Sequence, residues 1–476
     1  MGVLTGGRLP AEDAYAYGKF ARAVLRTNDI DFRARAHSAE EAEFLAAHVV
    51  ARPGVTYDQL EHANAVVLVG FEPEEESPIV FLRLRKAVRS HGTRVYAVAS
   101  HTSRGLYKLS GTVLRAQPGS EAHVVEAIAR DGEVAIDGGG VVLVGERAAT
   151  SPGLLSAVAT LAESTGARIG WVPRRAGERG ALEAGLLPNL LPGGRPLSDA
   201  AARVDLAATW GVDVVSSTPG RDGNAIVAAA AAGELKALVV AGIDLSDLSD
   251  PAAAVLALET VPFVVSLEVR RSEVTERADV ILPVAATAER AGTFVNWEGR
   301  LRPFDKVLET SALNDIRVLA GIAEELDAAL GFRTVQEARL EMQELGPWDG
   351  DPSTLTATAV QPSARAGAGE MVLSTWRMLI DDSRAVAGEP YLQATGRAPV
   401  AVVSEAALAR LGIAAGGLVT VSTPSGSVTL GTVVADVADD VVWLPSRGPA
   451  GTGGFNLQRD LRAQPGSVVR VTRGVI

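Results

Sequence analysis

Three short apolar runs along the chain end in a glycine that is followed within two residues by an acidic side chain. They read AVVLVGFE at 65–72, VVLVGERA at 141–148 and ALVVAGIDL at 237–245. Continuous runs of Val and Leu are typical of strands that are buried on both faces, as in parallel sheets. Between the first two runs, Phe81, Leu84 and Val88 recur at helical spacing over 79–90, and a further strand is predicted at 94–99.

The same alternation continues, with predicted helices at 154–163 and 225–232 and predicted strands at 167–172, 262–267 and 278–282. The last of these is predicted to be a buried strand that Pro283 stops. Strands that alternate with helices of about ten residues imply right-handed βαβ units and a doubly wound parallel sheet. Ligands bind at the carboxyl ends of such strands, where Gly70, Gly145 and Gly242 lie. None of them opens a Gly-x-Gly-x-x-Gly fingerprint, so tight turns are the simpler interpretation.

The pattern changes after about residue 330. The segment 346–369 is rich in Pro, Gly, Ser, Thr and Ala and has the composition of a linker or a long surface loop. From Pro399 onward, short Val-rich segments such as APVAVVS, GLVTVST and DVVWLPS are separated by Gly, Pro and Asp. This spacing predicts a small closed β-barrel that begins close to Pro399.

Composition narrows the possible functions. The chain has 476 residues, more than one core usually serves, so two or three domains are expected. Its longest apolar run, 225–232, is too short for a membrane helix, and the first nine residues do not form a secretory signal. A formal charge of -12 opposes general attraction to nucleic acid. The triplet Glu74 to Glu76 is interpreted as a solvated acidic loop that precedes a helix rather than as a catalytic pair.

The chain contains no cysteine, so by itself it can hold neither a thiolate-bound iron-sulfur cluster nor a disulfide. Its six histidines, at 37, 48, 62, 91, 101 and 123, follow no zinc-site spacing, and no metal site is predicted. Neither a phosphate loop nor a Gly-x-Ser-x-Gly elbow occurs. No catalytic residue is therefore predicted, and a plain nucleotide-binding or decarboxylase-like α/β protein is disfavoured.

Several segments resemble a known family. The most specific is TERADVILPVAATAERAGTFVNWEGR at 275–300, and further pieces are LTGGRLPAEDAYAYGKFAR near the start, TNDID at 27–31 and VGFEPEEESPIVFLRLRKA at 69–87. They resemble the molybdopterin oxidoreductase fold, and more closely its non-catalytic version in the G-subunit family of NADH-quinone oxidoreductase, bacterial complex I. The resemblance runs from Val3 to Arg473, and the segment 166–196 favours the G-subunit family over a molybdenum enzyme.

The resemblance implies an α/β fold with two doubly wound parallel-sheet layers followed by a small C-terminal β-barrel. We expect a discontinuous first α/β domain at 1–35 and 222–345, and a second α/β domain at 36–221. A linker at 346–385 and the barrel at 386–476 are expected to follow. Metal-binding relatives place a Cys or selenocysteine before a His, where this chain has Ala36 before His37. Direct ligation of molybdenum is not expected there, although Ser38 is adjacent, and His37 is expected at the surface or at a helix cap.

As implied by the resemblance, the chain is a structural scaffold in a complex that carries electrons from NADH through flavin and iron-sulfur clusters to quinone and pumps protons. The expected partners are other peripheral-arm subunits, including a cluster-bearing chain, at the cytoplasmic face of the plasma membrane. No cofactor is expected in this chain. The cluster motifs that precede this region in the family are absent, so the chain is expected to be truncated or separately encoded.

Two alternatives stay open. The chain could instead be an oxidoreductase of the formate dehydrogenase and nitrate reductase family that binds a pterin dinucleotide. Its cleft candidates are then Asn28, Gly70, Gly145, Asn224, Gly242 and Asn296, for which turn and loop-capping roles are the simpler interpretation. Near the start, Tyr15 and Phe20 either face the core or cover an interface with a cluster-bearing part, in which case the isolated chain would self-associate.

Overall fold

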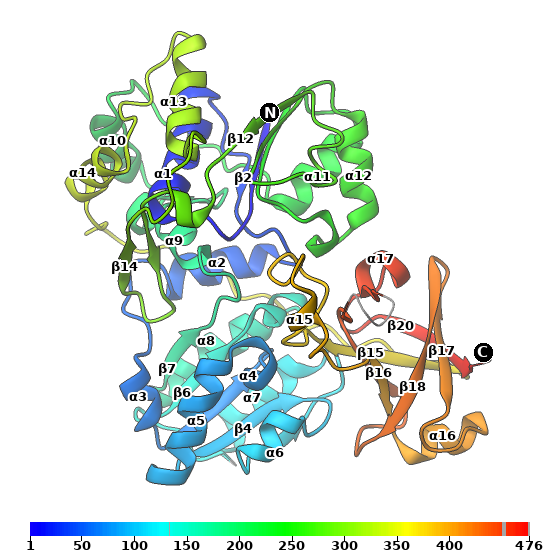
Figure 1. The fold of residues 1–476 in the computed structure, drawn as a ribbon. Helices are drawn as coiled ribbons and strands as arrows, with labels where there is room; N and C mark the ends of the chain where they lie inside the picture. The colour runs from blue at the N-terminus through cyan, green and yellow to red at the C-terminus, as the bar shows by residue number, and fades with distance from the viewer. Residues whose placement is uncertain (133, 450–453, 475–476) are drawn as a thin grey trace. The chain divides into compact units, whose positions relative to one another are not determined.

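The chain folds into two compact units in a computed structural model that describes residues 1–132, 134–449 and 454–474 (Figure 1). Unit 1 comprises Met1–Gly54 and Arg175–Thr356, and unit 2 comprises Val55–Arg174 and Ala357–Ile476. Both units are therefore discontinuous in sequence. Each contains a five-stranded parallel sheet, and unit 2 also contains the barrel, so the predicted fold class is confirmed.

The sheet of unit 1 has the order β12-β11-β10-β1-β2, and all its pairings are parallel. Its strands are β1 (Gly2–Thr5), β2 (Ile30–Asp31), β10 (Leu238–Ala241), β11 (Val264–Glu268) and β12 (Val280–Pro283). The strand predicted at 278–282 therefore exists as β12, but the expectation that it is buried is wrong. It pairs only with β11 among the described residues, so Ile281 remains 49% exposed at the edge.

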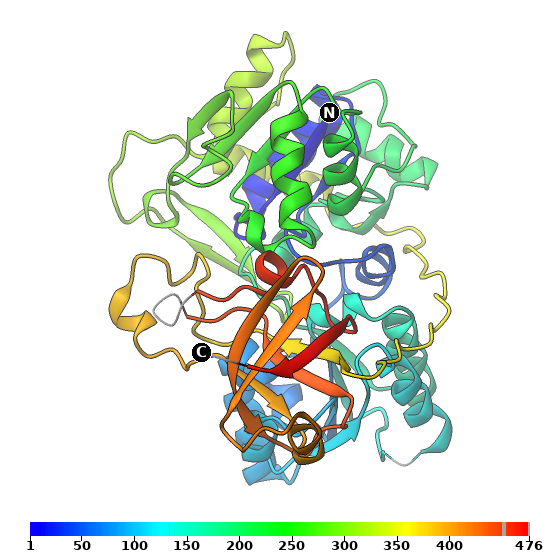
Figure 2. The ribbon, with the colours of Figure 1, turned by 90° about the vertical axis from the view of Figure 1, so that its right-hand side faces the viewer.

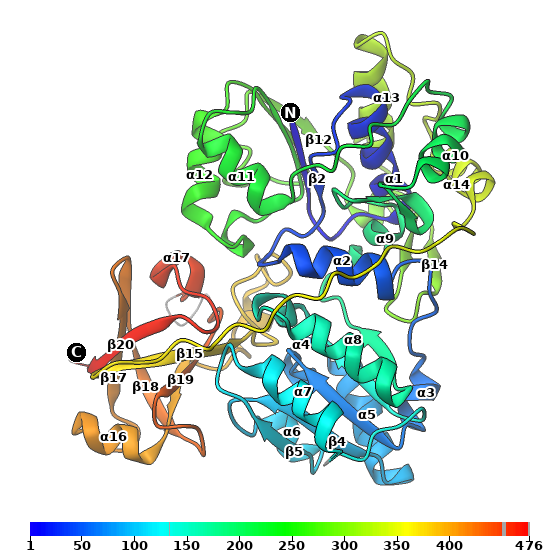
Figure 3. The same ribbon diagram turned by 180° about the vertical axis from the view of Figure 1, so that it is seen from behind.

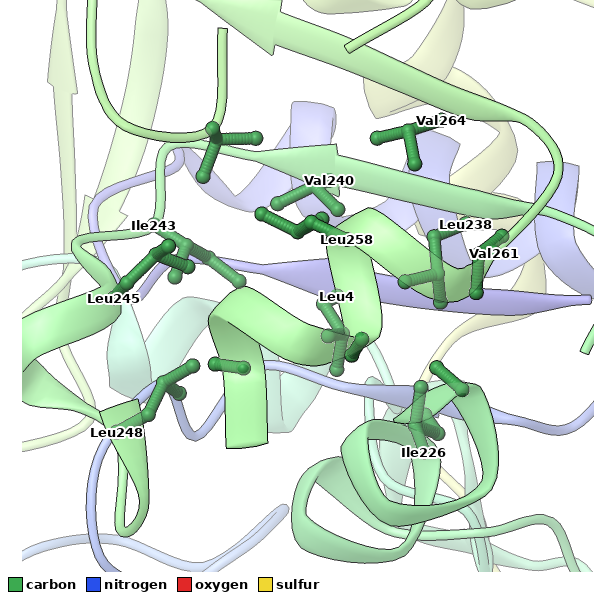
Figure 4. Close-up of a cluster of buried hydrophobic side chains, with 14 of the residues drawn as sticks. Leu4, Ile226, Leu238, Val240, Ile243, Leu245, Leu248, Leu258, Val261 and Val264 are labelled. Carbon is green, nitrogen blue, oxygen red and sulfur yellow. The ribbon is translucent and has the colours of Figure 1, made fainter. Parts of the chain in front are cut away.

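Helices cover both faces of this sheet. Figure 1 shows α11 (Gly223–Ala231) and α12 (Pro251–Thr260) on one face, and α1 (Ala11–Lys19) and α13 (Asp315–Glu325) on the other. On the α11 and α12 side, Leu4, Leu238 and Val264 from three strands pack against Ile226 and Leu258 from the two helices (Figure 4). This arrangement follows from the apolar runs, because a strand that is buried on both faces needs a helix layer on each side.

Helix α1 decides between the two interpretations of the first residues. Every residue of Ala11–Lys19 is buried, Tyr15 is fully buried and Phe20 is 2% exposed. Tyr15 stacks on Phe332 and donates its hydroxyl to Glu341, while Trp210 donates to the Tyr15 oxygen. The aromatic side chains of this helix therefore belong to the core of unit 1. The predicted interface surface at Tyr15 and Phe20 is not formed by these residues.

The sheet of unit 2 has the order β5-β4-β3-β6-β7 and is also parallel throughout. Its strands are β3 (Ala65–Val69), β4 (Arg94–Ala99), β5 (Thr112–Arg115), β6 (Val141–Val144) and β7 (Arg168–Trp171). Helices α4 (Pro73–Glu76) and α5 (Pro78–His91) lie in front of the sheet in Figure 1, whereas α7 (Glu121–Asp131) and α8 (Leu154–Thr165) lie in front of it in Figure 3. The predicted alternation over 65–172 is confirmed.

The barrel is closed in the order β15-β19-β16-β18-β17-β20 (Figure 2). Its strands are β15 (Glu370–Trp376), β16 (Val400–Val403), β17 (Leu418–Thr423), β18 (Gly426–Val434), β19 (Val441–Pro445) and β20 (Val468–Arg473). The structure differs here from the boundaries that we predicted, since β15 lies within the expected linker. Its pairing partners β19 and β20 are far along the chain, so local composition gave no sign of the strand. Residues 450–453 and 475–476 of the predicted barrel lie outside the described residues.

The predicted second domain at 36–221 also differs from the observed division. Helix α2 (Ala39–His48) and the segment after Arg175 belong to unit 1. Arg35 pairs with Glu41 of α2 and Glu178 of α9 (Glu178–Glu183), which ties these pieces to the end of β2. Buried ion pairs join segments that are distant in the sequence, so the observed boundary differs from the predicted one. Patterns along the sequence do not reveal such pairs.

Shorter elements complete the two units. Unit 1 also contains a π-helical turn (Phe20–Val24), α10 (Ala200–Trp210), the hairpin β13 (Gly292–Val295) and β14 (Leu301–Phe304), α14 (Val335–Leu345), and the short pair β8 (Leu190–Leu191) and β9 (Arg195–Pro196). Unit 2 also contains α3 (Tyr57–Glu61), α6 (Arg104–Lys108), α15 (Pro390–Gln393), α16 (Glu405–Leu411) and α17 (Leu457–Leu461). Within the described ranges, no helix is long and apolar enough to cross a membrane.

Candidate functional site

The carboxyl end of the unit 2 sheet holds a small polar pocket. Its cavity measures about 50 Å³, and Glu72, Ser100, His101, Glu121, Arg147 and Trp376 are among the residues that line it. Ser100 and His101 follow β4, Glu72 follows β3, Arg147 follows β6, and Trp376 ends the barrel strand β15. The pocket thus lies where ligands bind in doubly wound sheets, although pockets for small organic ligands usually measure ~300–1,000 Å³.

Gly70 and Gly145 meet at the floor of this region. Gly70 has φ +57°, and a Cβ at this position would lie 2.4 Å from the backbone nitrogen of Ala148. A Cβ on Gly145 would lie 2.5 Å from the carbonyl oxygen of Gly70. Each glycine is therefore required by the close approach of two strand-to-loop turns. This contact explains both residues without any ligand.

The ionisable groups of the pocket have perturbed pKa values. Burial raises the pKa of Glu72 although Ser103 donates to its carboxylate, and burial likewise raises the pKa of Glu121. Burial, together with the nearby Arg115, lowers the pKa of His101 to about 4, so this imidazole is neutral at physiological pH. Burial alone would lower the pKa of Arg147, but the carboxylate of Glu76 outweighs it and the pKa is raised. Such groups in a pocket are a physical reason to consider it a candidate functional site.

Aromatic and hydroxyl contacts close the pocket on the barrel side. The ring of His101 stacks on Trp376 with a centroid distance of 5.0 Å, and Trp376 packs against Trp443 at 4.6 Å. The hydroxyl oxygens of Ser100 and Ser374 lie 2.9 Å apart. These side chains fill the carboxyl end of β4, so that the remaining cavity has room for only a few water-sized molecules.

Helix α4 lies on the other side of the pocket, and its contacts correct the interpretation of the acidic residues Glu74 to Glu76. Glu76 accepts two hydrogen bonds from Arg147, at 3.0 and 3.2 Å, and Glu75 accepts from the backbone of Leu379 and pairs with Arg397. The prediction of a solvated acidic loop is therefore wrong. Glu75 is paired because α4 packs beside loops of the barrel segment, some 300 residues away in sequence, and Glu76 is paired because Arg147 follows the neighbouring strand β6.

Four of the six cleft candidates lie in unit 1, and three of these are asparagines with structural partners. Asn28 accepts from Arg22 Nε at 3.0 Å and donates to the carbonyls of Ser216 and Thr218. The side chain of Asn224 donates to the carbonyl of His37, and Asn296 accepts the backbone N–H of Arg300 in the tip of the β13–β14 hairpin. These contacts agree with the loop-capping interpretation.

Gly242 is the fourth candidate in unit 1. It has φ +65°, and a Cβ there would meet none of the described residues within 4 Å. Its carbonyl oxygen instead faces Gly6, where a Cβ would lie only 2.2 Å away. The glycine that the close approach requires is therefore Gly6, which follows β1. Gly242 serves a turn at the end of β10.

The carboxyl end of β2 is filled by ion pairs. Arg33 is fully buried and holds both oxygens of Asp31, with Nη2 2.7 Å from Oδ2 and Nε 3.1 Å from Oδ1. Burial would raise the pKa of Asp31, but the charge of Arg33 and the hydrogen bonds from Arg33 lower it to about 2. Arg33 and Arg35 both also contact Glu41. All these charges are paired within unit 1.

His37 is buried, so the expectation of a surface position is wrong. Its Nδ1 donates to the carbonyl of Arg35 at 2.7 Å, and its Nε2 accepts the backbone N–H of Asn224 in the first turn of α11 at 3.3 Å. The ring therefore caps a helix, which was the other role that we expected. Ser38 accepts the backbone N–H of Glu41 and caps α2.

Sequence reasoning missed most of the pocket. Among its ionisable residues, Glu72 and Arg147 lie in the quoted apolar-run motifs and His101 is one of the six histidines, but none of them was predicted as a site residue, and Glu121 lies in no quoted motif. A signal existed for two of them, because His101 and Arg147 each follow a buried strand by two or three residues. No local signal marks Trp376, which reaches the pocket through the pairing of β15 with β19.

Comparison with known proteins identifies the family. A model described as molybdopterin oxidoreductase matches residues 1–324, which is more than half of the chain. The chain belongs to the molybdopterin oxidoreductase family. A second model, "Molydopterin dinucleotide binding domain", matches residues 371–467 of this family member. This match begins within β15, in agreement with the observed start of the barrel.

Among members of the molybdopterin oxidoreductase family, the G subunit of NADH-quinone oxidoreductase from Mycobacterium bovis is 52% identical over 480 residues. The corresponding G subunit from Streptomyces coelicolor is 49% identical over 504 residues. Both alignments cover 99% of this chain but only 59% of the relative, so the chain spans about three fifths of their length. The solved structure of acetylene hydratase from Pelobacter acetylenicus is similar in fold, with a TM-score of 0.53, 12% identity, and coverage of 99% of this chain and 86% of that one.

The family name raises the question of whether these residues fit a molybdenum-bound pterin. Ala36 offers no donor atom, and both ring nitrogens of the adjacent His37 are already used. In unit 2, the space at the carboxyl end of β4 is filled by His101 and Trp376, and about 50 Å³ remains. A dinucleotide would need several times that volume. Neither position, considered within its own unit, fits the group, and we derive no chemistry through it.

Proposed function

We propose that this chain is part of the large peripheral-arm subunit of a respiratory NADH-quinone oxidoreductase and acts there as a structural scaffold. The observation that carries the proposal is the 52% identity to the G subunit of such an enzyme along 99% of the chain. In such a complex, electrons from NADH pass through flavin and iron-sulfur clusters to quinone, coupled to proton translocation. The chain would contribute shape and contact surface.

The types of side chain that the chain contains support a role without a cofactor. The chain has no cysteine, and iron-sulfur clusters are held by cysteine thiolates with few exceptions. Within the described part of the chain, no group of three or more His, Asp or Glu side chains is placed to hold a metal ion. The proposed partners are therefore other peripheral-arm subunits, including a cluster-bearing chain, at the cytoplasmic face of the plasma membrane.

Purification from the host tests this proposal. A tagged chain, isolated from membranes in mild detergent, should copurify with flavin- and cluster-bearing subunits and with NADH oxidation by quinone. The matched control is the tagged Tyr391→Ala variant, whose substituted side chain is 85% exposed on the short helix α15. Recovery of the chain alone from membranes that retain the intact complex would contradict the proposal.

Metal analysis of the same preparation separates the proposal from its alternative. The complex should contain iron, whereas the chain, dissociated from its partners and purified again, should contain neither iron nor molybdenum in stoichiometric amount. Stoichiometric molybdenum, with oxidation of formate or reduction of nitrate, would instead identify a pterin-dependent oxidoreductase.

A further inference from the structure

Unit 1 contains a second group of buried charges, which lies between α1, α13 and the start of the β13–β14 hairpin. Asp13 comes from α1, Asp315 is the first residue of α13, and Arg290 precedes the hairpin. Their side chains are 1%, 2% and 7% exposed. None of them contributes to the pocket of unit 2 or to the ion pairs at the end of β2.

One guanidinium serves both carboxylates. Arg290 Nη1 lies 3.0 Å from Asp13 Oδ2 and also pairs closely with Asp315 Oδ2. If both aspartates were ionised, the cluster would hold one uncompensated negative charge. A buried charge without a partner costs several kcal/mol, so a group of this kind takes up a proton instead.

Among the described residues, the charged groups on α1, α9, α14 and the π-helical turn do not supply the missing partner. On α1, Glu12 is occupied by Arg339 of α14 and by Thr293 of β13, with Arg339 Nε 2.6 Å from Glu12 Oε1. Also from α14, Glu341 pairs with Lys19 at 2.8 Å. Helix α9 turns Gly180 toward α1, and its charged residues Glu178, Arg179 and Glu183 pair elsewhere. In the π-helical turn, Arg22 binds Asn28 and backbone carbonyls.

Two orphaned polar atoms point to the same conclusion. Asp13 Oδ2 has no hydrogen-bond partner among the described residues, because its contact with Arg290 is not aligned for one. The Nε of Arg290 is also buried without a partner within the described ranges. The remaining oxygens are satisfied, since Tyr17 donates to Asp315 Oδ1 at 2.8 Å and the backbone of Ile316 donates to Asp13 Oδ1 at 3.2 Å.

We propose that unit 1 contains a buried proton-binding site in which Asp13 and Asp315 share one proton beside Arg290. The proton neutralises the second carboxylate and couples proton occupancy to the packing of α1 against α13. Burial, which Arg290 offsets only in part, raises the pKa of Asp13 to about 7, in agreement with this assignment.

The expected effect on stability has a definite sign. Between pH 3.8 and about 7, the native state holds a proton that the carboxyl of Asp13 in the unfolded chain has lost. The contribution of the cluster is therefore full below pH 3.8 and decreases as the pH rises toward 7, above which it changes no further. The melting temperature of unit 1 should fall across this window.

Infrared spectroscopy of the full chain tests the site directly. The wild-type protein should show a protonated-carboxyl stretch at about pH 6 that disappears with a midpoint near 7. Asp13→Asn and Asp315→Asn should each abolish this band, because Arg290 then balances the charge of the one carboxylate that remains. They should also flatten the pH dependence of the melting temperature. Glu341→Gln is the matched control, since it neutralises a partly buried carboxylate that already has its own cation and should leave the band unchanged.

A protonated-carboxyl band that keeps its full intensity and its midpoint near 7 in either asparagine variant would overturn the proposal. So would a wild-type spectrum without such a band at about pH 6, which requires no variant to fold. Stabilisation by sodium but not by choline chloride, with the band absent, would also overturn it, because a metal cation would then hold the place assigned to the proton.

Discussion

The two parallel sheets have the same strand pattern, yet their carboxyl ends are filled by different chemistry. In unit 1, Arg33 is enclosed by Asp31 and Glu41 in a network of charges with almost no exposure. In unit 2, His101 and Trp376 form an aromatic stack beside a cavity of about 50 Å³. The strands set the position of each site, whereas the residues that follow the strands decide what it can do.

The comparison also shows two ways in which the space for a ligand is filled at the end of a parallel sheet. In unit 1 the polar groups of Arg33 are used by two carboxylates and a backbone carbonyl, and those of His37 are used by the backbone. In unit 2 a barrel strand carries an indole ring to the end of the sheet. The stability of unit 1 is therefore expected to be sensitive to the removal of a charge, and the stability of unit 2 to the removal of a packed side chain.

The largest effect is expected from Arg33→Met, which leaves Asp31 and Glu41 buried with too few cations. Breaking a buried ion network in this way costs about 3–5 kcal/mol of unfolding free energy. Urea denaturation followed by hydrogen exchange of the unit 1 strands should detect it. Lys306→Met removes one partner of an exposed pair with Glu309 and should change stability by less than about 0.5 kcal/mol. Equal effects of the two variants would mean that burial of the network is unimportant.

Trp376→Ala should destabilise unit 2 by about 3 kcal/mol, because it removes a ring that is 8% exposed and packs on His101 and Trp443. Hydrogen exchange should increase in β4 and in the barrel strand β15, while the strands of unit 1 keep their protection. Tyr391→Ala is the control, since that ring is 85% exposed. Faster exchange in the sheet of unit 1 would argue against the separate stability of the two units.

A smaller, pH-dependent effect is expected from His101. Its pKa is lowered from 6.5 to about 4, so the unfolded chain binds more protons than the native state between these values. The contribution of His101 to the stability of unit 2 is therefore fully present above pH 6.5 and is lost as the pH falls toward 4. This pH dependence is opposite in sign to that of the Asp13 cluster. His101→Gln should flatten this dependence in thermal unfolding. His62→Gln, at a side chain that is 55% exposed, should leave it in place.

The smallest effect concerns the hydroxyl contact between the sheet and the barrel. Ser100→Ala removes hydrogen bonds to His101 and Ser374 and should cost about 1 kcal/mol. In the Ser374→Ala background the same change should cost less, because the shared bond is already absent. Denaturant midpoints of the two single variants and the double variant measure this coupling. Ser425→Ala, on an exposed barrel turn, serves as the control, and strict additivity at 100 and 374 would contradict the contact.

The sequence by itself determined the elements whose signals are local. The Val-rich runs at 65–72 and 141–148 and the helical spacing of 79–90 correspond to β3, β6 and α5, because burial on two faces or on one face produces a periodic pattern. Turn glycines such as Gly70 and Gly145 were also recognisable. Their mutual contact, which explains why both are glycine, depends on the pairing of β3 with β6.

Only the tertiary structure decided which charges are paired and which rings fill a site. The sequence pattern predicted a solvated position for Glu75, but in the structure Leu379 and Arg397 from the barrel segment contact its carboxylate, and no sequence pattern marked Asp13. The energy of a buried charge depends on the groups within a few ångströms of it, whatever their separation along the chain. For Asp13 those groups are Arg290 and Asp315, which lie some 300 residues away in sequence, so the charge imbalance beside α1 becomes visible only when the fold brings them together.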